Sequence, residues 1–159
     1  MPTQTYIPLA NITLSSAVGN VTFSSIPATY RDLVLVMNGT SSSGNPFAFL
    51  RFNGDSGSNY NYAFMYGDSA SAVSSTFSSQ TTGFIGNIDT GLRNNVIAQI
   101  MDYSATDRHK TTLARSDAGL VIATSGRWAN TSAVTSMSVN VNTGSFSAGF
   151  TFALYGIVS

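Results

Sequence analysis

Short runs of alternating apolar and polar side chains recur along the whole chain, and no window of about a dozen residues carries the 3.6-residue period of a helix. Alternation with period two is typical of strands that have one face on a core. The run 33–37 is apolar throughout, which indicates a strand buried on both faces or central in its sheet. Strands are predicted over 6–14, 21–26, 32–38, 47–52, 60–64, 83–88, 95–103, 110–115, 120–128, 134–141 and 149–157.

About nine to eleven short strands at regular spacing predict an all-β fold. We expect an antiparallel β-sandwich, jelly-roll-like, and a single domain over residues 1–159. The chain is long enough for a two-layer core, and no internal repeat, heptad or domain boundary is visible.

The most distinctive stretch is 51–62, in which Asn, Gly, Asp and Ser separate two alternating runs, 47–52 and 60–64. These residue types tolerate positive φ or close Asx turns, so the pattern predicts two strands joined by a polar loop. By contrast, 67–82 holds mainly Ser, Ala, Thr and Gly around Val73 and Phe77. We expect a long surface loop there with at most one short strand, and loops of that length are often functional or contact a partner.

Charged residues make up 9% of the chain, against about 25% in ordinary globular proteins, while apolar residues make up 43%. The chain is therefore expected to fold with a surface rich in hydroxyl and amide groups. The net charge is zero and no basic stripe is present, so nucleic-acid binding has no support. Cysteine is absent, which excludes disulfides and thiolate metal sites.

The N-terminal residues lack a basic region followed by an apolar core, and no apolar run approaches the length of a membrane span. We therefore expect synthesis in the cytoplasm, no membrane partner, and an extracellular life only after lysis or assembly.

His109 is the only histidine, and Asp102 and Asp107 are near it in sequence, so a base with an orienting acid can be considered. A catalytic triad also needs a nucleophile elbow, and no Gly-x-Ser-x-Gly occurs. The simpler interpretation is that 108–110 opens a strand facing solvent. We assign no catalytic residue and expect that the chain is not an enzyme.

Asn53, Asp55 and Asn59 could offer oxygens to a calcium ion, but their spacing does not match an EF-hand and a single carboxylate gives little affinity. We assign no metal and no cofactor.

Five large amphipathic rings form either a platform on which sugars stack or part of the core and of subunit contacts. These rings are Trp128, Tyr60, Tyr62, Tyr66 and Tyr103. The core or contact interpretation is favoured, and the sugar platform stays open.

Three arginines lie within predicted strands, and we expect them to form structural or interface ion pairs with Asp32, Asp55 or Asp102. They are Arg51, Arg115 and Arg127.

The order of motifs along nearly the whole chain resembles small β-rich virion proteins of tailed bacteriophages, especially cyanophages and other aquatic phages, and related segments resemble the terminal domains of phage fibres. The motifs are 6–10, 21–27, 30–35, 51–55, 109–111, Arg115, Trp128, 131–136, 149–152 and 154–157. The resemblance implies a structural role and brings no catalytic residues with it.

We compare three candidate functions for this chain. The first is a capsid decoration or cement protein, located in the virion, that binds the major capsid protein and forms a homotrimer. The second is a tail-fibre or receptor-binding domain that recognises host surface glycans, although the first predicted strand begins too near Met1 for an attachment part or shaft. The third is a cell-wall hydrolase, which would want paired carboxylates on a chain that has few acids.

Self-association is expected because strand edges left open invite pairing and the chain has one lysine, Lys110, to guard them. The loops 39–45 and 67–82 are the candidates for contacts with capsid subunits. Within them, Val73 or Phe77 is expected to insert into the contact, since the burial of an apolar side chain must offset the ordering of the loop.

Overall fold

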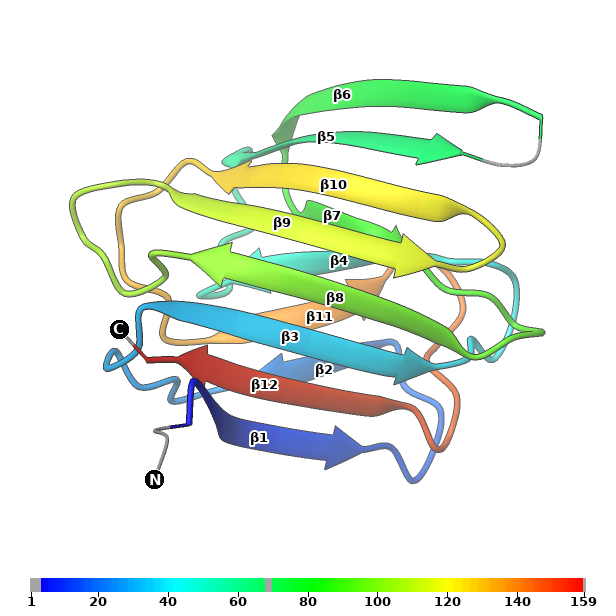
Figure 1. Cartoon of the computed structure of the whole chain (residues 1–159), viewed down its shortest axis with the longest axis horizontal. Helices are drawn as coiled ribbons and strands as arrows, with labels where there is room; N and C mark the ends of the chain where they lie inside the picture. The colour runs from blue at the N-terminus through cyan, green and yellow to red at the C-terminus, as the bar shows by residue number, and fades with distance from the viewer. Residues whose placement is uncertain (1–3, 68–69, 159) are drawn as a thin grey trace.

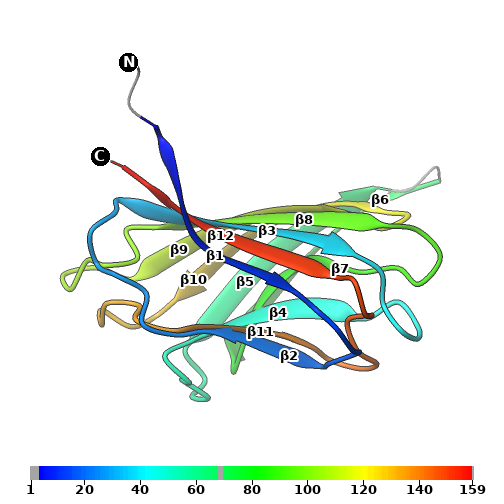
Figure 2. The ribbon, with the colours of Figure 1, turned by 90° about the horizontal axis from the view of Figure 1, so that it is seen from below.

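The computed structural model describes residues 4–67 and 70–158, and in this part of the chain two antiparallel sheets face each other and no helix is present. Figure 2 shows the two layers from the side. The predicted all-β antiparallel sandwich of jelly-roll type is confirmed. No helix in the described residues is therefore available to cross a membrane.

Apart from β6 (Ala72–Gln80), which lies in the stretch predicted to be mainly a loop, the strands overlap the predicted ranges. The strands are β1 (Tyr6–Thr13), β2 (Asn20–Phe23), β3 (Asp32–Gly39), β4 (Phe47–Phe52), β5 (Tyr60–Gly67), β6 (Ala72–Gln80), β7 (Gly83–Asn87), β8 (Asn94–Met101), β9 (Lys110–Asp117), β10 (Val121–Trp128), β11 (Met137–Val141) and β12 (Thr151–Ile157).

The large sheet has eight strands in the order β1-β12-β3-β8-β9-β10-β5-β6, and the small sheet has four in the order β2-β11-β4-β7 (Figure 1). The first five strands alternate between the sheets, so chain neighbours rarely pair there. The sequence suggested that 47–52 and 60–64 are two strands joined by a loop, but they do not form a hairpin. β4 pairs with β11 and β7, whereas β5 pairs with β10 and β6. Alternation identifies a strand but does not select its partner.

The core lies between the sheets, and β3 runs through its middle. β3 pairs with β12 on one side and β8 on the other, which confirms the central position predicted from the apolar run 33–37. Leu33, Leu35 and Met37 are fully buried. Burying each such side chain contributes about 1.5–3 kcal/mol relative to exposure.

The stretch 67–82 is not the predicted loop, because most of it forms the nine-residue strand β6 at the edge of the large sheet. Val73, Ser75 and Phe77 point to one face of the sheet and alternate with Ser74 and Thr76 on the other. The period of two was hard to recognise because serine and threonine occupy positions on both faces. Figure 1 shows β5 and β6 extending past the strands of the small sheet.

Candidate functional site

The outer face of the large sheet, which points away from the core, carries two cross-strand rows of side chains in its middle. We call them the middle rows. The first is Thr76, Ala63, Ser125, Leu113, Gln99, Val34, Tyr155 and Pro8. The second is Ser74, Met65, Ala123, Arg115, Ile97, Val36, Ala153 and Asn11. Each row spans all eight strands, and the two rows meet β1 on either side of the bulge between Pro8 and Ala10.

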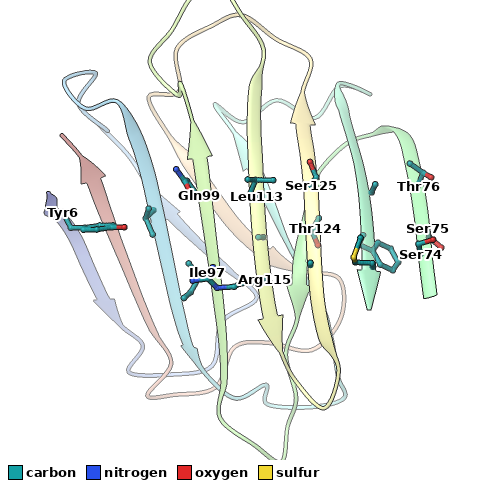
Figure 3. A pocket seen from close by; sticks show the side chains of 16 residues that line it. Tyr6, Ser74, Ser75, Thr76, Ile97, Gln99, Leu113, Arg115, Thr124 and Ser125 are labelled. Atoms are coloured by element: carbon teal, nitrogen blue, oxygen red, sulfur yellow. The ribbon is translucent and has the colours of Figure 1, made fainter. Parts of the chain in front are cut away.

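A groove of about 790 Å³ lies on this face, and Figure 3 shows side chains that line it, among them Leu113, Gln99 and Ser125 from three adjacent strands. Met65 is 62% exposed and Leu113 is 46% exposed, although both are large apolar residues. Scattered exposed apolar residues are normal, but a continuous group that lines a groove indicates a contact surface.

The rows on either side of the middle rows carry more polar side chains, although one of them includes Met101 and the other includes Val121, which is 72% exposed. Toward one end of the strands, Arg127 lies opposite Thr111. Toward the other end, Asp117 lies opposite Asn95, which lies opposite Asn38. An apolar centre with a polar rim is the usual anatomy of a protein contact.

The outer face of the small sheet is different. Its rows place Thr22, Ser138 and Arg51 opposite one another, and Asn20 opposite Asn140. Over β2 and β11 this face is hydroxyl- and amide-rich, but the row of Asn140 continues to Phe49 and Phe84, and Phe47 beside them is 48% exposed. Each outer face therefore has an apolar part: the middle rows on the large sheet, and the phenylalanines of β4 and β7 on the small sheet.

Arg115 brings the one positive charge of the middle rows to a position between Ala123 and Ile97. Among the described residues, no carboxylate forms an ion pair with it, so the predicted pairing with Asp32, Asp55 or Asp102 is wrong. The same holds for the predicted pairs of the other two strand arginines. A planar guanidinium in apolar surroundings suits a carboxylate or carbonyl oxygen supplied by a bound partner.

The acids that were expected to pair with these arginines have other partners. Asp32 is buried and accepts hydrogen bonds from Arg31 Nε (3.2 Å), Gln99 Nε2 (3.1 Å) and the backbone N–H of Asp102 (3.0 Å). The bond from Gln99 fixes that side chain at the wall of the groove. Asp102 lies 3.5 Å from Arg108, which also holds Asp107 at 2.9 Å.

His109 is exposed in the loop before β9, and the two acids near it in sequence are both engaged by Arg108. The arrangement that would make His109 a base with an orienting acid is therefore not assembled. Lys110 corrects another expectation, because it was predicted to face solvent and to guard an edge. It is 0% exposed, and its Nζ donates to the carbonyls of Ala105, Arg108 and Thr131.

Lys110 can be buried because these three carbonyls replace the water that its ammonium group loses. Burial lowers the pKa of Lys110, and the charges of Asp107 and Asp102 act in the opposite direction. Lys110 therefore fastens the loop before β9 to the segment after β10.

The polar loop between β4 and β5 is a structural corner. Asp55 accepts hydrogen bonds from Trp128 Nε1 (2.6 Å), Asn59 Nδ2 (2.9 Å) and the backbone N–H of Gly57 (2.9 Å). Burial acts to raise the pKa of Asp55, but the hydrogen bonds from Trp128, Asn59 and Gly57 outweigh it and lower the pKa.

The oxygen of the Asn53 side chain is likewise engaged, since it accepts from the backbone N–H groups of Thr135 and Ser136. Of the three residues considered for calcium, Asp55 and Asn53 thus use their oxygens inside the fold, and Asn59 donates its Nδ2 to Asp55. In the part of the chain that the structure describes, no group of three or more His, Cys, Asp or Glu is placed to hold a metal ion.

The rings considered as a sugar platform are mostly internal. Trp128, Tyr60 and Tyr103 are fully buried, and Tyr62 is nearly so, which confirms the core interpretation for these four. Burial raises the pKa of Tyr60 to about 12, and its Oη accepts the backbone N–H of Phe52 at 2.9 Å. Of the five rings, Tyr66 alone is only half-buried.

Val73 and Phe77, the candidate partner contacts, are 36% and 40% exposed on the core-side face of β6. Phe77 stacks on Tyr62 with ring centroids 5.2 Å apart and on Phe64 at 6.0 Å. Their insertion into a partner stays a prediction.

Sequence reasoning missed the middle rows. A signal was present in 95–101, where apolar residues occupy both sets of alternating positions: Val96, Ala98 and Ile100 face the core, and Ile97 faces outward. Such a strand covers an apolar surface on each side.

No family model matches the chain, and no curated protein matches it. Among solved structures, it is similar to alginate lyase Aly36B, with 13% identity and a TM-score of 0.38 over 96% of this chain and 78% of that chain. It is also similar to a variant of that lyase in complex with alginate tetrasaccharide, with 13% identity and a TM-score of 0.36 over 92% of this chain and 77% of that chain.

These comparisons correct the expectation that the chain is not an enzyme, because the solved structures it is similar to are those of enzymes. At this TM-score the similarity assigns no activity, substrate or residue role to the chain.

Proposed function

We propose that this chain is a structural protein of a bacteriophage virion, of the capsid decoration or cement type, that binds the head shell through the outer face of its large sheet. The order of motifs along the chain supports the virion part of the proposal, because it resembles small virion proteins of tailed phages. The chemistry of the middle rows supports the binding surface.

The observation that carries the proposal is the contrast between the two outer faces. The middle rows present Leu113, Ile97 and Met65 beside a groove, whereas the outer face of the small sheet presents serine, threonine and asparagine over β2 and β11 and has phenylalanines only at β4 and β7. Covering the exposed apolar atoms with a partner is favourable at roughly 25 cal/mol per Å². The partner surface that fits is apolar in its centre and brings a carboxylate or carbonyl oxygen opposite Arg115. The major capsid protein is the partner we propose.

The test uses phage heads prepared without this chain and the purified protein, with binding measured by co-sedimentation. Leu113→Asp places a charge in the middle of the contact and is expected to abolish binding. Thr22→Asp, at an exposed position on the small sheet, is the matched control and is expected to bind like the original chain. Equal binding of both variants contradicts the proposed surface.

Salt gives a second readout. Because Arg115 is the one charge in the middle rows, binding is expected to change little between low and molar salt. Complete release at molar salt contradicts an apolar contact.

One observation favours a second candidate, a tail-fibre or receptor-binding domain for host glycans. Arg115, Gln99 and Ser125 bring polar groups to the groove beside Leu113, and a few polar groups in an apolar groove orient a small ligand. The guanidinium would suit an acidic sugar. A particle map that places the chain only on the tail, with glycan binding lost in Arg115→Gln, supports this candidate against the first.

A further inference from the structure

The two sheets have four edges, and three of them are guarded. β1 contains Pro8 and a bulge between Pro8 and Ala10, both of which interrupt pairing with another strand. β2 has only four residues. β7 has five residues, of which four are buried.

The fourth edge is unguarded. β6 is the longest strand of the structure, with nine residues, and it contains no proline and no charged residue. Its one irregularity lies near its end, where Ser79 has positive φ and the register with β5 shifts between Tyr60 and Tyr62. The stretch from Ala72 to Phe77 pairs regularly with β5 on one side. Because β6 is the last strand of the sheet, the backbone groups on its other side are open for hydrogen bonding.

The sequence of this open segment reads nearly the same in both directions: Val73, Ser74, Ser75, Thr76, Phe77. If two copies run antiparallel with Ser75 opposite Ser75, Phe77 of each copy lies opposite Val73 of the other. Thr76 then lies opposite Ser74, again twice. An aromatic side chain opposite a β-branched one, and a threonine opposite a serine, are favourable pairs across adjacent strands.

The aromatic rings beside this segment are also incompletely covered. Seven aromatic rings, which we call the aromatic strip, form a connected series with centroids 5.2–6.3 Å apart. Tyr62, Phe64, Tyr66 and Phe77 lie on the core-side face of β5 and β6, and they contact Phe47, Phe49 and Phe84 on the outer face of β4 and β7. Phe77 ends the series at the open edge and is 40% exposed, so a strand added there covers it.

We propose that two copies of this chain pair edge to edge through β6, antiparallel and about a two-fold axis at Ser75. The pairing joins the two large sheets into one continuous sheet and closes the unguarded edge of both copies. It joins the middle rows of one copy to those of the other, because Ser74 and Thr76 are their end members. A two-fold pair replaces the homotrimer expected from the sequence, since an edge that complements itself closes with two copies.

The test uses the purified chain alone and measures its association by sedimentation velocity, so it does not depend on the proposed virion role. Ser74 and Thr76 are exposed on the outer face, and substituting them leaves the core intact. Ser74→Asp and Thr76→Lys are each expected to weaken dimerisation on the order of tenfold, because each altered contact occurs twice in the pair.

The double variant Ser74→Asp/Thr76→Lys is expected to recover the affinity, since the proposed register places each aspartate opposite a lysine of the other copy. Asn11→Lys, on the outer face of the β1 edge, is the control and is expected to dimerise like the original chain. A chain that stays monomeric at the highest soluble concentration overturns the proposal. So does a trimer, or a dimer that none of the β6 variants weakens.

Discussion

The two ends of the large sheet are built to opposite designs. At one end, β1 and β12 pack over β2, and the residues between them join the main core: Phe146, Phe150 and Phe152 are fully buried, with ring centroids 4.8–4.9 Å apart. At the other end, β5 and β6 reach beyond the small sheet, and the rings beneath them remain partly exposed. Both clusters are aromatic, and they differ in how completely other parts of the chain shield them from solvent.

The incompletely covered aromatic rings and the edge strand without protecting residues thus lie at the same end of the large sheet. The end with a complete core has an edge interrupted by Pro8, whereas the end with exposed rings has an edge without a charge. One added strand would complete both features of the second end. The following predictions test this comparison, beginning with the largest expected effect.

The largest difference is expected between Phe152 and Phe64, which occupy the second strand from each edge. Phe152 on β12 is fully buried, and Phe152→Ala is expected to cost about 3–5 kcal/mol of unfolding free energy. Phe64 on β5 is half-buried, and Phe64→Ala is expected to cost about 1–2 kcal/mol, because part of its surface already meets water. Urea unfolding of the two variants at low protein concentration measures the difference. Equal losses would mean that the β5 end is as well covered as the β12 end.

Lys110 tests how much the buried hydrogen bonds that join the loop before β9 to the segment after β10 contribute to the stability of the fold. Lys110→Met keeps the stem but leaves the carbonyls of Ala105, Arg108 and Thr131 without their donor. The expected cost is about 2–3 kcal/mol, since unpartnered buried carbonyls keep their desolvation penalty. His109→Met, one position away and exposed, is the matched control and is expected to be neutral within about 0.5 kcal/mol. Thermal unfolding compares the pair, and two neutral variants would mean that water reaches these carbonyls.

These side chains also mark what sequence could predict. The strands of the large sheet were recognisable because a period of two is a local property: β8, β9 and β10 lie close to their predicted ranges. Their antiparallel succession could be read as well, since short turns join them. The pairing of strands that are far apart in sequence could not be predicted, because the partner of β4 is β11, far along the chain, and nothing local in 47–52 selects it.

The candidate site was less predictable than the fold. The outward position of Leu113 depends on which face of β9 the second sheet covers, and that is decided by strands far away in sequence. The burial of Lys110 depends on a carbonyl from Thr131, in another loop. Val73 and Phe77 were singled out as the two large apolar residues in a stretch of small ones, but they lie on the core-side face of β6, outside the middle rows, and their role as contacts stays a prediction.

Asp55 gives a smaller, pH-dependent effect at the corner that joins the two sheets. Asp55→Asn is expected to cost about 1 kcal/mol at neutral pH, because charge-assisted hydrogen bonds from Trp128 and Asn59 become neutral ones. In the original chain the folded pKa of Asp55 is lowered, so its stabilisation is complete above the unfolded pKa and is lost as the pH falls through the folded pKa.

The measurement is the urea midpoint as a function of pH. The original chain and Asp55→Asn are expected to differ at pH values above about 4, where the unfolded carboxyl is ionised, and to converge in more acidic solution. Asp107→Asn, at an exposed ion pair, is the control with little expected change. A constant difference across the acid range would mean that the charge of Asp55 plays no part.

The smallest effect on the single chain is expected at the edge strands themselves, and it separates folding from association. Ile12 on β1 and Phe77 on β6 both point toward the core side of their sheet, but Ile12 packs against the covered core and Phe77 lies at the open end. Phe77→Ser is expected to cost under about 1 kcal/mol in the monomer, because the ring loses only its stacking on Tyr62 and Phe64. Ile12→Ser is expected to cost more, since it puts a hydroxyl group into apolar surroundings. In sedimentation the order should reverse, with Phe77→Ser abolishing association and Ile12→Ser leaving it unchanged in the folded fraction. Such a reversal would mean that the β1 edge is covered when the single chain folds, whereas the β6 edge is covered only when a second copy binds. The same order in both measurements would mean that Phe77 stabilises the monomer and takes no part in association.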